Sequence, residues 1–230
     1  HRLIVTSSTY RQDSKASPSL LEKDPQNRLL ARGPRFRLSG ELIRDHMLQA
    51  SGKLSGKMFG PGVYPPQPLT VLAHAFGNKS WNASKGEDRY RRSIYTFIKR
   101  TAPFAGFMTF DGTSGENCLA KRDRSNTPLQ ALTLLNDEMY LELARSAGEE
   151  VHQSKDDPIH SLFRRFLTRP PKQSETDALR AYYEQQIQRL EKGEIKPSEI
   201  TAIPKASPEL AGKVLLARAI MNLDEAITKP

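Results

Sequence analysis

Cysteine is nearly absent from this chain of 230 residues, which contains only Cys118. A single thiol cannot form an internal disulfide, so the fold must rest on packing and polar contacts. Long apolar runs are missing as well, and no stretch approaches the ~18 residues that a membrane span requires. The sequence therefore predicts no membrane span, and the cysteine count leaves the cellular compartment open.

The familiar sequence motifs of catalysis and cofactor binding are also missing. The chain has no Cys-x-x-Cys pair, no His-Glu-x-x-His zinc motif and no Cys-x-x-Cys-His haem-attachment motif. It lacks the nucleophile motif Gly-x-Ser-x-Gly and the phosphate-binding loops GxGxxG and GxxxxGKS. We therefore predict no catalytic residue, no metal site and no cofactor in this chain.

Acidic residues are outnumbered, because 35 Lys and Arg face 26 Asp and Glu and leave a net charge of +9. Such a chain attracts polyanions. The basic residues are nevertheless interleaved with acids, and none of the basic runs typical of nucleic-acid arms occurs. Nucleic-acid binding is therefore the least favoured function for this chain.

Apolar residues at helical spacing fill the second half and predict a helical bundle over residues 126–230. The clearest pattern follows Asp157-Pro158, where apolar residues recur at i, i+3, i+4, i+7 and i+8. N-cap and proline signals predict helix starts at Pro128, after Asn136, at Pro158, at Ser174 and at Pro208. A polar linker is predicted over residues 194–206.

The first half, residues 1–125, is predicted to be rich in loops. Residues 1–10 favour a short helix, and residues 11–37 are expected to be loop with one helical turn near Asn27–Leu30. A second helix is predicted from Ser39 to the stop signal at Gly52.

Two later segments of the first half, residues 93–98 and 107–110, have the β-branched and aromatic composition of strands. Together the patterns predict a mainly α fold, a helical bundle with long irregular loops and at most a small two-stranded β element. We expect one domain over residues 1–230. Because the chain begins at His1 without Met, we also expect a fragment of a longer protein.

The stretch "KRDRSNTPLQAL" at residues 121–132 places three cations before a predicted helix start, which itself carries partial positive charge. Arg122 and Arg124 are therefore predicted to turn away and meet carboxylates, with Asp111 and Asp137 as their partners. This interpretation makes the arginines clamps in an arginine–carboxylate network that fastens loops to the bundle. The alternative is an anion site, which an ordered sulfate or phosphate at Asn126–Leu129 would support.

Candidate binding residues follow from these two interpretations. For an anion or a partner they are Arg92, Arg100, Arg122, Arg124 and Asn126. For stacking against a ligand they are Trp81 and Tyr95, although a Trp in a loop more often anchors that loop to the core.

Four stretches in order carry a family resemblance: "HRLIVTSSTYRQ", "FRLSGELIRDHMLQASGKL", "RRSIYTFIKRTAPF…MTFD…ENC" and "NTPLQALTLLND". The tail "LLARAIMNLDEAIT" agrees. The chain resembles the planctomycete-type domain of unknown function called DUF fifteen-fifty-three or planctomycete-specific domain one. Gly40 departs from the family pattern, which has Ala or Glu there. The family has no established catalytic residues to carry over.

The resemblance implies a C-terminal position in a large exported protein, hence a periplasmic or cell-surface location. It also implies an upstream companion domain and often an upstream cytochrome c domain, so haem is expected only outside this chain. A non-catalytic module that packs on the companion and contributes to binding an anionic or polysaccharide partner is the favoured function. Such a module should leave an apolar or arginine-rich face uncovered.

A carbohydrate-active hydrolase with an unfamiliar carboxylate site stays open as the alternative. Its candidates gather in the middle of the sequence, as Asp111, Glu116, Arg122, Asn126 and Asp137. A glycosidase needs two carboxylates facing one cleft, which a sequence cannot show.

Overall fold

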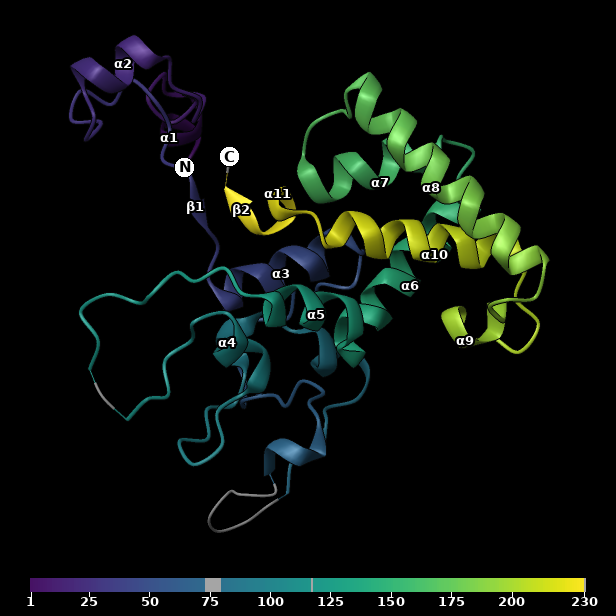
Figure 1. The fold of residues 1–230 in the computed structure, drawn as a ribbon. Helices are drawn as coiled ribbons and strands as arrows, with labels where there is room; N and C mark the ends of the chain where they lie inside the picture. Colours follow the sequence, from purple (N-terminus) through teal and green to yellow (C-terminus); the bar gives the residue numbers. More distant parts are fainter. Residues whose placement is uncertain (73–79, 117, 230) are drawn as a thin grey trace.

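The computed structural model describes residues 1–72, 80–116 and 118–229, and over these ranges the fold is mainly α, as predicted (Figure 1). The helices are α1 (Arg2–Thr6), α2 (Pro18–Lys23), α3 (Gly40–Ala50), α4 (Ala105–Thr109), α5 (Pro128–Asn136), α6 (Glu138–Gln153), α7 (Pro158–Leu167), α8 (Gln173–Glu191), α9 (Pro197–Thr201), α10 (Pro208–Met221) and α11 (Asp224–Ile227). Three short 3-10 helices, η1 (Leu69–Leu72), η2 (Gly86–Tyr90) and η3 (Ser93–Tyr95), lie between α3 and α4.

The bundle is built around α10, which crosses α6 and is also packed by α7, α8 and α9 (Figure 1). Apolar side chains of α3, α6, α7 and α10 make one continuous core. The α6–α10 crossing is close because Gly148 carries no side chain. A Cβ at that position would lie 2.7 Å from Cγ2 of Val214 and 2.9 Å from its Cα.

Helix starts agree well with the capping signals. Side chains of Ser39, Asp157 and Ser207 each accept a backbone N–H in the first turn of α3, α7 and α10. Two starts need correction. Asn136 ends α5 and Asp137 caps α6 instead, while α8 begins at Gln173 with the Glu175 carboxylate accepting the Lys172 N–H at 2.7 Å.

Two loop predictions were also wrong in part. Residues 11–37 contain α2 and the strand β1 (Phe36–Arg37), and the predicted linker 194–206 contains α9. The helical turn expected at Asn27–Leu30 is a turn closed by the Leu30 N–H and the Asn27 carbonyl at 3.3 Å, outside any helix. A proline at N1 begins both missed helices, and short helices of this kind carry too few residues to show a period.

The predicted strands at residues 93–98 and 107–110 are not strands. Residues 93–95 form η3, and Phe107 lies in α4, which packs on the first turn of α3. The two-stranded sheet instead joins β1 to β2 (Thr228–Lys229) in antiparallel pairing, with Phe36 opposite Lys229. This packing also explains the glycine at position 40, because a Cβ there would lie 3.1 Å from the Phe107 Cα.

Residues 1–35 form an N-terminal arm that extends from β1 away from the bundle (Figure 1). Neither α1 nor α2 has a buried residue. The arm is ordered by its own polar contacts. The buried Asp24 carboxylate accepts the backbone N–H groups of Arg28 and Leu29, each at 2.8 Å.

Candidate functional site

Buried arginines organise the irregular half of the molecule. Arg44 on α3 is 1% exposed, and its guanidinium donates to the main-chain carbonyls of Arg91 at 2.7 Å and Arg89 at 3.1 Å. The equally buried Arg91 donates to the carbonyls of Phe59 and Pro61 and stacks 3.8 Å over the Tyr95 ring. These arginines are clamps, but their partners are carbonyls more than the predicted carboxylates.

Arginine–carboxylate pairs occur as well, closer to the surface. Arg89 contacts Glu138 and Glu142 on α6, so it ties η2 to the bundle. Arg169 contacts Glu175 at 2.7 Å and Glu225 at 2.6 Å, which joins the start of α8 to α11.

The cationic segment 121–124 crosses to the start of α3 instead of staying at the start of α5. Arg122 does meet a carboxylate, but it belongs to Glu41, whose two oxygens accept from Nη1 at 2.9 and 2.8 Å. The Arg124 guanidinium lies 4.7 Å from the centroid of the Phe36 ring and has no ion pair within the described residues. The predicted partners, Asp111 and Asp137, are thus wrong.

Both of those carboxylates serve local structure. Asp111 accepts the Ser125 backbone N–H and the Ser125 hydroxyl, both at 2.8 Å, and so fixes the loop before α5. Asp137 accepts the Met139 N–H at 3.0 Å as the cap of α6. Burial raises the pKa of Asp137, against the backbone hydrogen bond from Met139, which lowers it.

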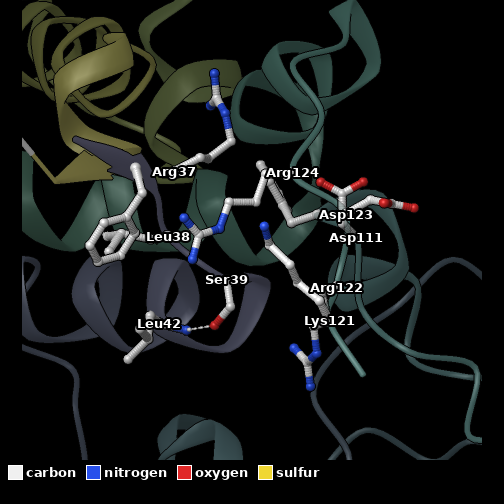
Figure 2. Close-up of a pocket in the computed structure, with 11 residues that line it drawn as sticks. Arg37, Leu38, Ser39, Leu42, Asp111, Lys121, Arg122, Asp123 and Arg124 are labelled. Atoms are coloured by element: carbon white, nitrogen blue, oxygen red, sulfur yellow. Dashed lines mark hydrogen bonds between the residues drawn. The ribbon is translucent and has the colours of Figure 1, made fainter. Parts of the chain in front are cut away.

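A cavity of about 290 Å³ lies where segment 121–124 meets β1 and α3 (Figure 2). We call it the cationic cavity. Its charged or polar lining is Arg37, Ser39, Asp111, Lys121, Arg122, Asp123 and Arg124, and its apolar lining is Phe36, Leu38, Leu42 and Phe110. Arg37 pairs with Asp224 at 2.9 Å, which leaves Lys121 and Arg124 as the cations of this cavity with no carboxylate partner among the described residues.

A second hollow of about 480 Å³ lies on the other side of Leu42 and Arg122, which line both cavities. We call it the apolar groove. Its rim consists of Leu42, Ile94, Phe97, Ile98 and Met108, and Phe104 and Phe107 line it as well. Ile94 is 83% exposed, Ile98 is 74% exposed and Leu42 is 54% exposed. The two isoleucines belong to a predicted strand, and their sequence pattern gives no signal that they face solvent.

The predicted binding residues do not converge on one site. Arg122 and Arg124 line the cationic cavity, whereas Arg92, Arg100 and Asn126 are exposed and line neither cavity. Lys121 and Phe36, which were not among the predicted binding residues, line the cationic cavity as well. Their contribution depends on a contact between segments about 85 positions apart, which no local pattern reveals.

The two aromatic candidates have structural partners. Trp81 is 6% exposed, donates its indole N–H to the Pro65 carbonyl at 2.7 Å and stacks on Phe104 at 6.2 Å. It therefore anchors its loop. One face of the Tyr95 ring carries the Arg91 guanidinium, and its hydroxyl accepts the Phe59 N–H at 2.9 Å. Ligand stacking by either residue stays a prediction.

The candidate carboxylates of the hydrolase alternative do not share a cavity. Of Asp111, Glu116 and Asp137, only Asp111 lines the cationic cavity, where Asp123 is the other carboxylate. The described residues contain no cluster of three or more His, Cys, Asp or Glu side chains placed to hold a metal ion. Within the same residues, no helix has the length and apolar character needed to cross a membrane.

The comparisons with known proteins place the chain in a family. The model described as "PSD1: Protein of unknown function (DUF1553)" matches residues 1–183. The chain belongs to the DUF1553 family. The resemblance seen in the sequence is thereby confirmed, and the DUF1553 match takes in both the apolar groove and the cationic cavity. No curated protein and no solved structure matches the chain.

Proposed function

We propose that this DUF1553 chain is a non-catalytic interaction module of a larger exported planctomycete protein. In this proposal it packs on an upstream companion domain of the same protein through the apolar groove. The observation that supports it is the exposure of Ile94, Ile98 and Leu42 around one concave surface. Apolar side chains gathered in this way favour a docking surface, since each would be more stable out of water.

The surroundings of the groove support the same function. The Arg122–Glu41 pair and the Asp45 carboxylate lie at its edge, so an apolar centre is bordered by charge, as in many protein interfaces. Arg44 fixes one wall from beneath, because its Nη1 donates to the Ser93 hydroxyl at 3.3 Å and to the Arg91 carbonyl. A pre-formed wall lowers the entropy that binding must remove.

The proposal also covers the cellular location of the module and its binding partners. The module would be periplasmic or at the cell surface, would contribute to binding an anionic or polysaccharide partner, and would leave haem to an upstream domain. No observation favours the hydrolase alternative, because Asp111 and Asp137 accept hydrogen bonds from backbone and hydroxyl groups and Glu116 does not line the cavity that Asp111 lines.

Hydrogen–deuterium exchange tests the docking proposal. The exchange of peptides covering residues 93–98 is measured in this chain alone and in the longer protein that carries it. Burial by a companion domain should slow exchange there in the longer protein, while peptides from α8 keep the same rate. Equal rates in the two proteins would remove the groove as a docking surface.

A pair of double variants sharpens the test. Ile94→Asp with Ile98→Asp places charge in the groove, and Leu129→Asp with Leu132→Asp places the same charge on exposed leucines of α5. In the longer protein the groove variant should regain the fast exchange of the isolated chain, because the charges resist burial. The α5 variant should keep slow exchange. If both variants behave alike, the effect is not specific to the groove.

A further inference from the structure

We infer that the cationic cavity binds a tetrahedral oxyanion, a sulfate or phosphate group, held by Lys121 and Arg124. The inference rests on the anionic-partner part of the proposed function and not on docking through the apolar groove. The cavity draws its lining from three parts of the chain, namely β1, the start of α3 and segment 121–124 (Figure 2). Its volume of about 290 Å³ admits such a group together with several water molecules.

Charge compensation distinguishes the four cations of the cavity. Arg37 is paired with Asp224 and Arg122 with Glu41. Lys121 and Arg124 have no ion pair among the described residues, and Figure 2 shows the Arg124 guanidinium near Ser39, with the Lys121 ammonium between it and the carboxylate end of the cavity. Two like charges gathered at one cavity repel one another, and an anion between them converts this repulsion into attraction.

The carboxylates of the cavity do not pair with the Arg124 guanidinium. Both oxygens of Asp111 are occupied by Ser125, the nearer contacts being 2.8 Å. Figure 2 shows the carboxylates of Asp111 and Asp123 at the opposite end of the cavity from the Arg124 guanidinium. Competition from internal acids is thus weakest at the Arg124 guanidinium.

Arg124 is also held in place before any ligand arrives. Its guanidinium carbon lies 4.7 Å from the Phe36 ring centroid, and the Lys229 ammonium lies 5.8 Å from the same ring. Contact with a ring face leaves the in-plane N–H donors of a guanidinium free, and a planar fork of donors suits a tetrahedral oxyanion. The cap of α3 is already filled by the Ser39 hydroxyl, which accepts the Leu42 N–H at 3.5 Å, so the cations rather than the helix end make this site.

Titration calorimetry tests the inference with sodium sulfate and sodium phosphate in separate arms at pH 7. Ionic strength is held constant with sodium chloride, because exposed charge responds to screening. We expect saturable binding in at least one arm, and the tighter arm identifies the oxyanion. Lys121→Ala should weaken binding about tenfold, as the loss of one charge-assisted hydrogen bond implies.

Lys155→Ala is the matched control, since it removes one exposed lysine charge outside the cavity. It should leave the affinity unchanged. Arg124→Lys keeps the charge but removes the planar fork, and should also weaken binding without altering the thermal midpoint by more than a few degrees. Absence of saturable binding in both arms, or equal weakening by Lys121→Ala and Lys155→Ala, would overturn the inference. Neither outcome bears on the docking proposal, because the groove variants leave Lys121 and Arg124 unchanged.

Discussion

Arg44 shows how a single side chain can organise a segment that has little regular structure. Its guanidinium N–H donors meet carbonyls that η2 and η3 leave without helical partners, so the loop gains fixed hydrogen bonds without a strand. Burial lowers the pKa of the guanidinium to about 10, against a smaller opposite effect of Asp45. The group stays charged at neutral pH, and its hydrogen bonds are correspondingly strong.

Replacing Arg44 by Lys should lower the free energy of unfolding by about 3 kcal/mol. Lysine keeps the charge but cannot reach the carbonyls of Arg89 and Arg91 together, and each unpaired buried carbonyl costs ~1–3 kcal/mol. Urea denaturation followed by circular dichroism measures the change. Arg92→Lys, at an exposed arginine nearby, serves as the control and should stay within about 0.5 kcal/mol of the parent. Equal stability of the two variants would show that Arg44 is not a clamp.

The sequence predicted arginine clamps with carboxylate partners, but the most buried arginines, Arg44 and Arg91, donate mainly to main-chain carbonyls. A carboxylate is visible as Asp or Glu in the sequence, so Arg122 could be assigned to some acid. Every residue has a main-chain carbonyl, so residue type does not show which carbonyl will accept a hydrogen bond. The partners of Arg44 and Arg91 therefore could not be predicted from the sequence. The Arg124–Phe36 contact could not be predicted either, because no local sequence pattern shows which aromatic ring will contact a guanidinium distant in the sequence.

At the scale of elements, the start of α8 is joined to α11 by one arginine and two glutamates. Arg169 donates to Glu175 and Glu225, and Glu175 also accepts the backbone N–H of Lys172 at the start of α8. The Arg169 hydrogen bond lowers the pKa of Glu175 to about 2, although burial partly opposes it. Folding therefore favours the ionised form of this carboxyl.

This pKa sets a pH window for the contribution of Glu175. A carboxyl with a lowered folded pKa stabilises fully above its unfolded pKa of 4.5, and the contribution disappears as the pH falls towards 2. Glu175→Gln should therefore be less stable than the parent at pH 7, and the difference should shrink between pH 4.5 and 2. Thermal melts at a series of pH values measure it. A difference that stays constant with pH would contradict the assignment.

Helix boundaries divide into those that local chemistry determines and those that contacts determine. The caps at Ser39, Asp157 and Ser207 satisfy N–H groups within one turn, so the sequence was enough to predict them. Residues 93–98 were predicted from composition, but a strand also needs a neighbour. Among the described residues an isolated bridge between Val63 and Thr96 forms there in place of a ladder, because the facing segment is rich in Pro and Gly.

At the scale of the whole molecule, the bundle and the N-terminal arm differ in how they are held. The bundle has a continuous apolar core, while α1 and α2 have no buried residue. The arm touches the rest through surface contacts such as the Lys229 ammonium, 5.0 Å from the Tyr10 ring centroid. Leu3 and Leu29 are among its exposed apolar side chains.

Deletion of residues 1–34 should therefore leave the bundle folded. The thermal midpoint should fall by about 2 °C or less, because the arm meets the bundle through exposed side chains and ~1 kcal/mol corresponds to 2–4 °C for a chain of this size. Differential scanning calorimetry of the shortened and full chains measures the midpoint. A fall of roughly 10 °C would mean that the arm contributes to the core after all.

The mainly α fold followed from periodicity, whereas both cavities depend on contacts between distant segments. The apolar groove combines α3 with residues 93–108, and the cationic cavity combines β1 with segment 121–124. Periodicity reports which face of a helix is apolar, but it does not report which loop covers that face. Ile94 and Ile98 were therefore predicted only as strand residues, and the sequence did not show that the fold leaves them exposed.

The antiparallel pairing of β1 with β2 also has a mechanical consequence. The chain enters the bundle at Phe36 and leaves it at Lys229, and these two residues face each other at the same end of the ladder. A tension applied to the two ends of the chain would load the ladder bonds one after another, as a zipper opens, and not all together. The β1–β2 pairing would thus separate under weak force, while the helices of the bundle are still intact.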